Sequence, residues 1–143
     1  MSEILLSHQR AMHCYQQINS DLKIADKDTL KGYETTVAGM PAFLRNNGLL
    51  HFIAFLTQNS DHTAYKFCLD ALEQWLTKQS WTDYMADGKK TLYQYLLEHE
   101  TMTVQEHIAI ENEINELLVW LKSLLRAISA QQPQGTSSAG GQE

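Results

Sequence analysis

The residues whose types and spacing could do chemistry in this sequence are Arg45 and His51, which stand six positions apart. An imidazole could act as general acid or base on a ribose 2′-hydroxyl, while a guanidinium could stabilise the charge that develops on a phosphate. An ordinary interpretation is also open. A basic side chain near a helix C-terminus complements the helix dipole, and a histidine can simply sit on a largely buried helix.

The order of Arg45, a polar residue and His51 resembles the active-site signature of the all-α HEPN ribonucleases. That resemblance implies a metal-independent ribonuclease using these two residues, and it stands as the enzymatic alternative. The pattern rests on two residue types at a loose spacing, which recurs by chance. The sequence has no glycine-rich phosphate loop, no G-x-S-x-G and no C-x-x-C, so we expect a protein without enzymatic activity.

A second group of residues has side chains of the kinds that bind metals: Glu98, His99, Glu100, Glu106 and His107. Their spacing does not repeat a ligand pair on facing helices, so we expect no metal and no cofactor. His8 and His13 do not share a helix face and predict no joint role. Cys14 and Cys68 have no basic neighbours that would activate a thiol. We therefore expect both to be small apolar side chains buried in the core.

Composition limits the classes of function. The 143 residues are 43% hydrophobic and 20% charged, as expected for one globular domain. Eleven basic against seventeen acidic residues give a net charge of −6, the wrong sign for free-standing nucleic-acid binding. Any contact with RNA therefore needs a local basic patch. The cysteine usage and the short apolar runs predict a reduced, cytoplasmic protein without a membrane span.

Helical periodicity predicts the elements that must position these residues. Apolar residues recur at three- and four-residue steps from Ile4 to Leu22, with Ser2 placed to cap the helix, and again from Leu30 to Leu44. Within the second series, Pro41 predicts a kink or a new helical turn. Asn46–Gly48 should end that helix, because Asn and Gly tolerate left-handed backbone.

Further helices are predicted over Leu49–Leu56, Tyr65–Leu76, Lys89–Glu100 and Thr103–Ile128. The first of these is almost wholly apolar, which predicts a central position, and Lys66 can pair with Asp70 in the next. Thr103 and Glu106 have the spacing of a capping box. A loop is expected over Trp81–Gly88. The prediction is an all-α, single-domain bundle of five to six helices over residues 1–130, with a disordered tail over 131–143.

The last predicted helix carries different side chains on different faces. If Leu121 marks the centre of its buried face, Lys122 and Arg126 share one flank, Trp120 lies on the other and Val119 points away from the core. Its N-terminal half carries the acidic residues Glu111, Glu113 and Glu116. This distribution has two interpretations: complementarity to the helix dipole, or a basic edge for phosphates beside apolar residues for a protein partner.

Two blocks of sequence carry a more specific resemblance. The first reads MPAFLRNNGL over residues 40–49 and continues as FIAFL over 52–56, and the second reads WLKSLLRA over 120–127. Both resemble the signature regions of the small α-helical subunit of the type III-B CRISPR effector, the RAMP-module or Cmr complex. The similarity extends loosely from Tyr33 to Ala127.

The resemblance implies a non-catalytic subunit that stacks in several copies along the backbone subunits of an RNA-guided complex in antiviral defence. Its partners would be the backbone and large subunits, copies of itself, and the guide RNA and target RNA. Arg45 and Lys122 match the basic residues of the two blocks and would contact RNA. Ser123 stands where the family usually has a second basic residue, and Arg126 could substitute for it.

Other residues and alternatives complete these expectations. Lys66 and Lys78 are weaker candidates for RNA contact, and Val119 and Trp120 are candidates for a protein interface. Two non-enzymatic alternatives remain beside the HEPN ribonuclease. One is the small subunit of the related type III-A complex, which shares the all-α architecture, and the other is a helical adaptor without RNA contact.

Overall fold

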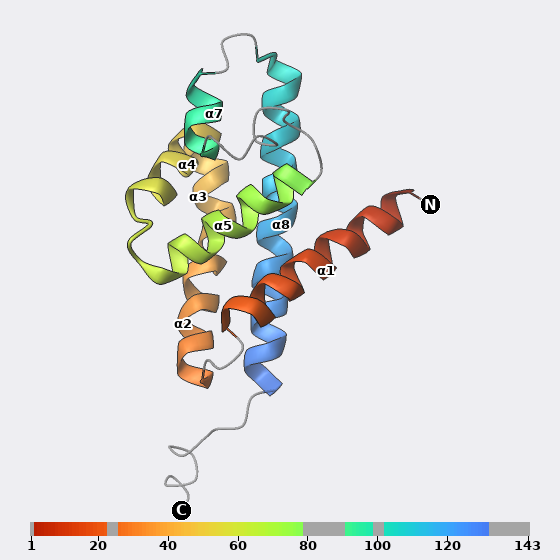
Figure 1. Ribbon diagram of the computed structural model, residues 1–143, viewed down its shortest axis with the longest axis vertical. Helices are drawn as coiled ribbons and strands as arrows, with labels where there is room; N and C mark the ends of the chain where they lie inside the picture. Colours follow the sequence, from red (N-terminus) through yellow and green to blue (C-terminus); the bar gives the residue numbers. More distant parts are fainter. Residues whose placement is uncertain (1, 23–25, 79–90, 99–101, 132–143) are drawn as a thin grey trace, which may run out of the picture.

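The computed structural model describes residues 2–22, 26–78, 91–98 and 102–131. They form α1 (Ser2–Leu22), α2 (Lys27–Ala38), α3 (Met40–Asn47), α4 (Leu49–Gln58), α5 (Thr63–Lys78), α7 (Leu92–Glu98) and α8 (Val104–Gln131). These ranges contain no strand, and the predicted all-α bundle is confirmed (Figure 1). The predicted loop at Trp81–Gly88, both ends of the predicted helix Lys89–Glu100 and all of the predicted tail except Gln131 lie outside the described residues.

Local sequence explains where the first helices begin and end. The Asp26 carboxylate accepts a hydrogen bond of 2.8 Å from the Thr29 amide and so caps α2. The predicted second helix divides at Gly39, and α3 begins with Pro41 in its first turn, where a missing N–H costs no hydrogen bond. Gly48 then has φ 88° and ψ 165°, a conformation open almost only to glycine, which turns the chain sharply into α4.

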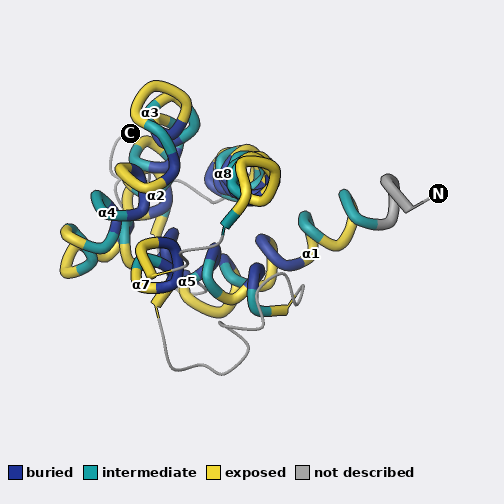
Figure 2. Tube along the Cα trace, turned by 90° about the horizontal axis from the view of Figure 1, so that it is seen from above, coloured by how far each residue is buried: buried dark blue, intermediate teal, exposed yellow. Residues whose placement is uncertain are grey.

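Helix α8 is the axis around which α1, α2 and α3 pack. Figure 1 shows α2 and α3 following one another along one side of α8, in the opposite direction, while α1 crosses its other side. Helix α5 lies across the bundle, and the buried faces of these helices turn toward a common centre (Figure 2). Trp75 of α5 and Phe52 of α4 are among the largest fully buried side chains. The central position predicted for the apolar α4 is wrong: α4 packs on α3, α5 and α7 at the edge of the bundle, with four of its residues buried and Leu50 and His51 exposed (Figure 2).

Two predicted local interactions are present. The Thr103 amide donates to Glu106 Oε1 at 2.8 Å, and the Glu106 amide donates to Thr103 Oγ1 at 3.0 Å. This reciprocal pair is the predicted capping box, and it satisfies two amides that the helix cannot. Lys66 pairs with Asp70 one turn later on α5 at 3.0 Å. The bundle thus holds α8 in a fixed register beside α3, which decides the geometry of the candidate site.

Candidate nucleic-acid interface

Arg45 lies in the last turn of α3, exposed to solvent, at the point where the chain turns through Gly48. Its side chain forms no hydrogen bond or ion pair with any described residue. It lines a pocket of about 140 Å³ between α3 and α8. The lining residues are Leu44, Arg45, Glu111, Asn112 and Asn115, and we call this the Arg45 pocket.

Lys122 and Arg126 follow on α8. Lys122 is seven residues after Asn115, which places it on the same face of the helix about 10 Å further along the axis. Lys122 also has no hydrogen bond or ion pair within the described ranges. Arg126 Nε lies 3.7 Å from Glu34 Oε2 of α2, and its side chain is 75% exposed. The contact is loose and weak, because exposed ion pairs contribute about 0–1 kcal/mol.

These three residues form one surface, which we call the basic seam: Arg45, Lys122 and Arg126. The antiparallel course of α2–α3 and α8 assembles it, since Arg45 faces the first half of α8 and Glu34 faces its last turns. Two of the three cations have no partner among the described residues. In a chain with net charge −6, the basic seam is a local surface on which phosphate oxygens could bind through charge-assisted hydrogen bonds.

The weaker basic candidates lie elsewhere and have partners. Lys66 is bound to Asp70, and Lys78 Nζ lies 3.3 Å from His13 Nδ1 at the contact of α5 with α1. The structure therefore does not bring Lys66 and Lys78 into the basic seam.

The two residues predicted to form a protein interface differ in how far they are exposed. Val119 is 45% exposed and points off the bundle, as the helical phase predicted. Trp120 is partly buried and packs against the hydrophobic core. Most of its apolar surface is therefore already covered within the chain, and Val119 is the more available of the two.

The two residues of the HEPN-like pattern have different neighbours. His51 is exposed in the first turn of α4 and stands edge-on to Phe43, with 6.0 Å between ring centroids. Arg45 instead lines a pocket with residues of α8. Among the described residues, no hydrogen bond joins the two side chains.

A buried charge cluster was not predicted from the sequence. Glu113, expected only as one of several acidic residues complementing a dipole, is 5% exposed. Its carboxylate accepts hydrogen bonds from Arg10 Nε at 2.7 Å, Arg10 Nη2 at 2.8 Å and Trp75 Nε1 at 2.8 Å. Burial alone would raise the pKa of Glu113, but these hydrogen bonds and the Arg10 charge outweigh it and hold the pKa below its ordinary value.

His13 is a second unpredicted buried group, since its position on α1 had suggested no role. Its Nε2 lies 2.9 Å from the Ala71 carbonyl oxygen. A carbonyl can only accept, so Nε2 carries the proton and Nδ1 accepts from Lys78. Burial lowers the pKa of His13, and the Lys78 charge lowers it further. No local spacing signals these contacts, because both partners of His13 lie on α5, 58 and 65 residues further along the chain.

The two cysteines are the buried fillers that the sequence predicted. Cys14 and Cys68 are both free and fully buried in the core. Burial raises the pKa of the Cys14 thiol to about 12 and that of Cys68 further still. Both thiols are therefore protonated near neutral pH and are poor nucleophiles.

Comparison with known proteins places the chain in a family. A family model described as CRISPR-associated protein (Cas_Cmr5) matches residues 6–128 of the 143. The chain belongs to the Cas_Cmr5 family. This is a family of small subunits of type III-B Cmr complexes. No curated protein and no solved structure matches the chain.

Membership in the Cas_Cmr5 family confirms the resemblance that the two sequence blocks carried. Both blocks, residues 40–56 and 120–127, lie inside the matched region. The match also favours type III-B over the type III-A alternative. The chain is therefore a CRISPR-associated subunit. Among the described helices, none is long and apolar enough to cross a membrane.

Proposed function

We propose that this Cas_Cmr5 chain is a non-catalytic small subunit that helps hold target RNA in a type III-B effector complex through the basic seam. The observation that supports this proposal is that Arg45 and Lys122 lie on one face of the bundle and have no hydrogen-bond or ion-pair partner among the described residues. Such cations can bind phosphate without first breaking an ion pair within the chain. The overall acidity of the chain suits a subunit whose RNA is brought by an assembled complex, because a chain of net negative charge attracts RNA poorly alone.

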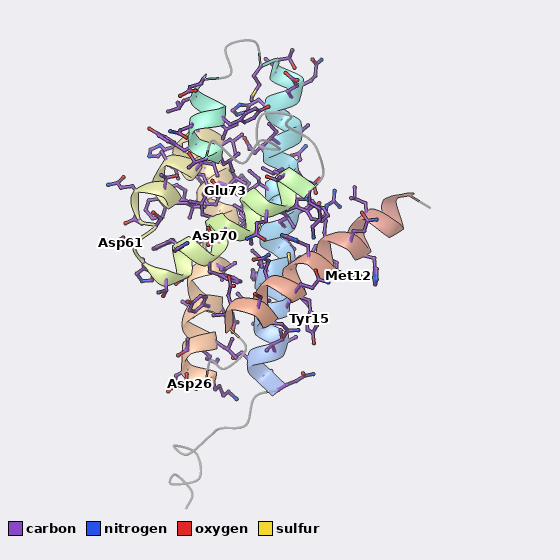
Figure 3. All side chains as sticks on the ribbon, in the orientation of Figure 1. Met12, Tyr15, Asp26, Asp61, Asp70 and Glu73 are labelled. Atoms are coloured by element: carbon purple, nitrogen blue, oxygen red, sulfur yellow. The ribbon has the colours of Figure 1, made fainter. Side chains whose placement is uncertain are left out.

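We further propose that several copies stack head to tail beside the backbone and large subunits, in the cytoplasm, along the guide RNA and its target. A stack of this kind needs two different surfaces on each copy. Two separate apolar places are available. Met12 and Tyr15, each about half exposed, lie on α1 (Figure 3). They line a hollow of about 840 Å³. Leu50 and Val104 line another, of about 350 Å³, where α4, α7 and α8 meet.

Target-RNA capture by the reconstituted complex tests the RNA-holding role. We expect the double variant Arg45→Ala/Lys122→Ala to capture RNA more weakly at low salt. Its plot of log affinity against log salt should be shallower by about 1.4 to 1.8, since each lost phosphate contact removes about 0.7 to 0.9. Lys66→Ala is the control for the loss of one positive charge, because it removes that charge from a residue already paired with Asp70 outside the seam.

The outcomes separate the alternatives. If the double variant keeps the wild-type affinity for RNA and the wild-type salt dependence, the basic seam does not hold RNA. That result would favour an adaptor without RNA contact. An equal loss for each charge removed in Lys66→Ala would point to overall charge rather than to the seam. The variants change exposed or half-exposed side chains, so circular dichroism should show an unchanged helical fold.

A further inference from the structure

The Arg45 pocket holds more unpartnered polar groups than phosphate binding requires. Beside Arg45, the side chains of Asn112 and Asn115 form no hydrogen bond with any described residue. Glu111 has only a long contact, 3.8 Å from its Oε1 to His107 Nε2, which exceeds hydrogen-bond distance. Leu44, 1% exposed, is the apolar residue of the lining. The pocket thus offers two amides, a carboxylate and a guanidinium to one small ligand group.

The carboxylate limits what this group can be. An ionised Glu111 can only accept hydrogen bonds, and it repels an anion that enters the pocket. A phosphodiester has no hydrogen to donate, so a phosphate would stay on the Arg45 side. The group that approaches Glu111 must therefore donate a hydrogen bond and carry no negative charge. A ribose 2′-hydroxyl fits, because it donates to a carboxylate and still accepts from an amide N–H of Asn115.

The pocket has a volume of about 140 Å³ and is open to solvent. A sugar ring can therefore enter it while the attached base stays outside. The adjoining Arg45 would then meet the phosphate attached to that sugar.

We propose that the Arg45 pocket binds one ribose of the captured strand, with the 2′-hydroxyl donating to Glu111 and the neighbouring phosphate on Arg45. The subunit would thereby distinguish RNA from DNA at this position. This inference rests on the proposed function, since it requires RNA to lie on the basic seam. It adds Glu111 and Asn115 as residues that determine the sugar specificity.

A scan of target RNAs, each with a single 2′-deoxy substitution, tests this assignment in the reconstituted complex. Loss of one such hydrogen bond should weaken capture roughly two- to tenfold at the positions that meet the pocket. In complexes with Glu111→Ala or Asn115→Ala, the same 2′-deoxy substitutions should have little further effect. Glu116→Ala is the matched control, an exposed glutamate on the same helix outside the pocket, and it should leave the penalty intact.

Three results would overturn the inference. In the first, no 2′-deoxy substitution weakens RNA capture by the wild-type complex. In the second, a 2′-deoxy substitution weakens capture equally in the Glu111→Ala complex. In the third, the loss that depends on Glu111 follows removal of a base amine and not removal of the 2′-hydroxyl. All three leave the proposed function standing if Arg45→Ala/Lys122→Ala still weakens capture. Unchanged capture by that double variant would instead refute the proposed function itself.

Discussion

The buried pair of Arg10 and Glu113 provides the sharpest test of how the bundle is held together. It joins α1 to α8 through two hydrogen bonds, and Trp75 of α5 adds a third to the same carboxylate. The side chains of Arg10 and Glu113 are only 15% and 6% exposed. Glu113→Ala therefore leaves a cation with little access to water and an indole N–H without its acceptor.

The expected cost follows from these two losses. Removing one partner of a buried ion pair destabilises a protein by about 3–5 kcal/mol. The lower end applies to Glu113→Ala, because the 15% exposure of Arg10 lets water reach the guanidinium. The unsatisfied Trp75 N–H adds about 1–3 kcal/mol of desolvation, so we expect a total loss of about 4 kcal/mol. Arg10→Ala should cost about 3 kcal/mol, because Glu113 keeps the hydrogen bond from Trp75.

Urea unfolding of the full chain, followed by circular dichroism, measures these losses. The double variant Arg10→Ala/Glu113→Ala should be more stable than the sum of the single losses predicts, by about 1.5–3 kcal/mol. Since the folded pKa of Glu113 lies below its ordinary value, its stabilising contribution is complete above the unfolded pKa and is lost as the pH falls through the folded pKa. Losses that simply add in the double variant would refute the role given to this pair.

Three further predictions concern single positions. The folded pKa of His13 is lowered, so the free energy of unfolding should fall as the pH drops below about 6.5. His13→Gln should flatten this pH dependence in urea titrations at several pH values. The same pH dependence in wild type and variant would contradict the prediction. Gly48→Ala should lower the free energy of unfolding by about 1–3 kcal/mol because of its positive φ, whereas Gly32→Ala, inside α2, should raise it by about 0.5–1 kcal/mol; equal effects would disprove the backbone argument. Met12→Asp should reduce the copies of this subunit per complex in native mass spectrometry, with exposed Gln9→Asp as control, and an unchanged copy number would exclude that surface from stacking.

Local interactions account for the part of the fold that the sequence predicted. Thr103 with Glu106 and Lys66 with Asp70 are three or four residues apart, so one helix suffices to bring them together. Gly48 marked the sharp turn after α3 because few other residues can adopt its conformation. These rules fixed where helices begin and end without information on their packing.

Contacts between distant helices could not be predicted in the same way. Arg10 and Glu113 are 103 residues apart, and Glu113 looks no different from the neighbouring Glu111 until α1 packs against α8. The candidate site shows both situations. Arg45 and Lys122 were identified by a family resemblance, but their common surface depends on α3 and α8 running antiparallel, and so does the pocket that includes Asn115.

The most direct test of the basic seam is photo-crosslinking within the assembled complex. Target RNA carrying 4-thiouridine would be crosslinked and the attached peptides identified by mass spectrometry. We predict crosslinks to two peptides of this subunit, one containing Arg45 at the end of α3 and one containing Lys122 in α8, both reduced in Arg45→Ala/Lys122→Ala. Crosslinks confined to other faces of the subunit, or absent from it, would contradict the claim that this seam holds RNA.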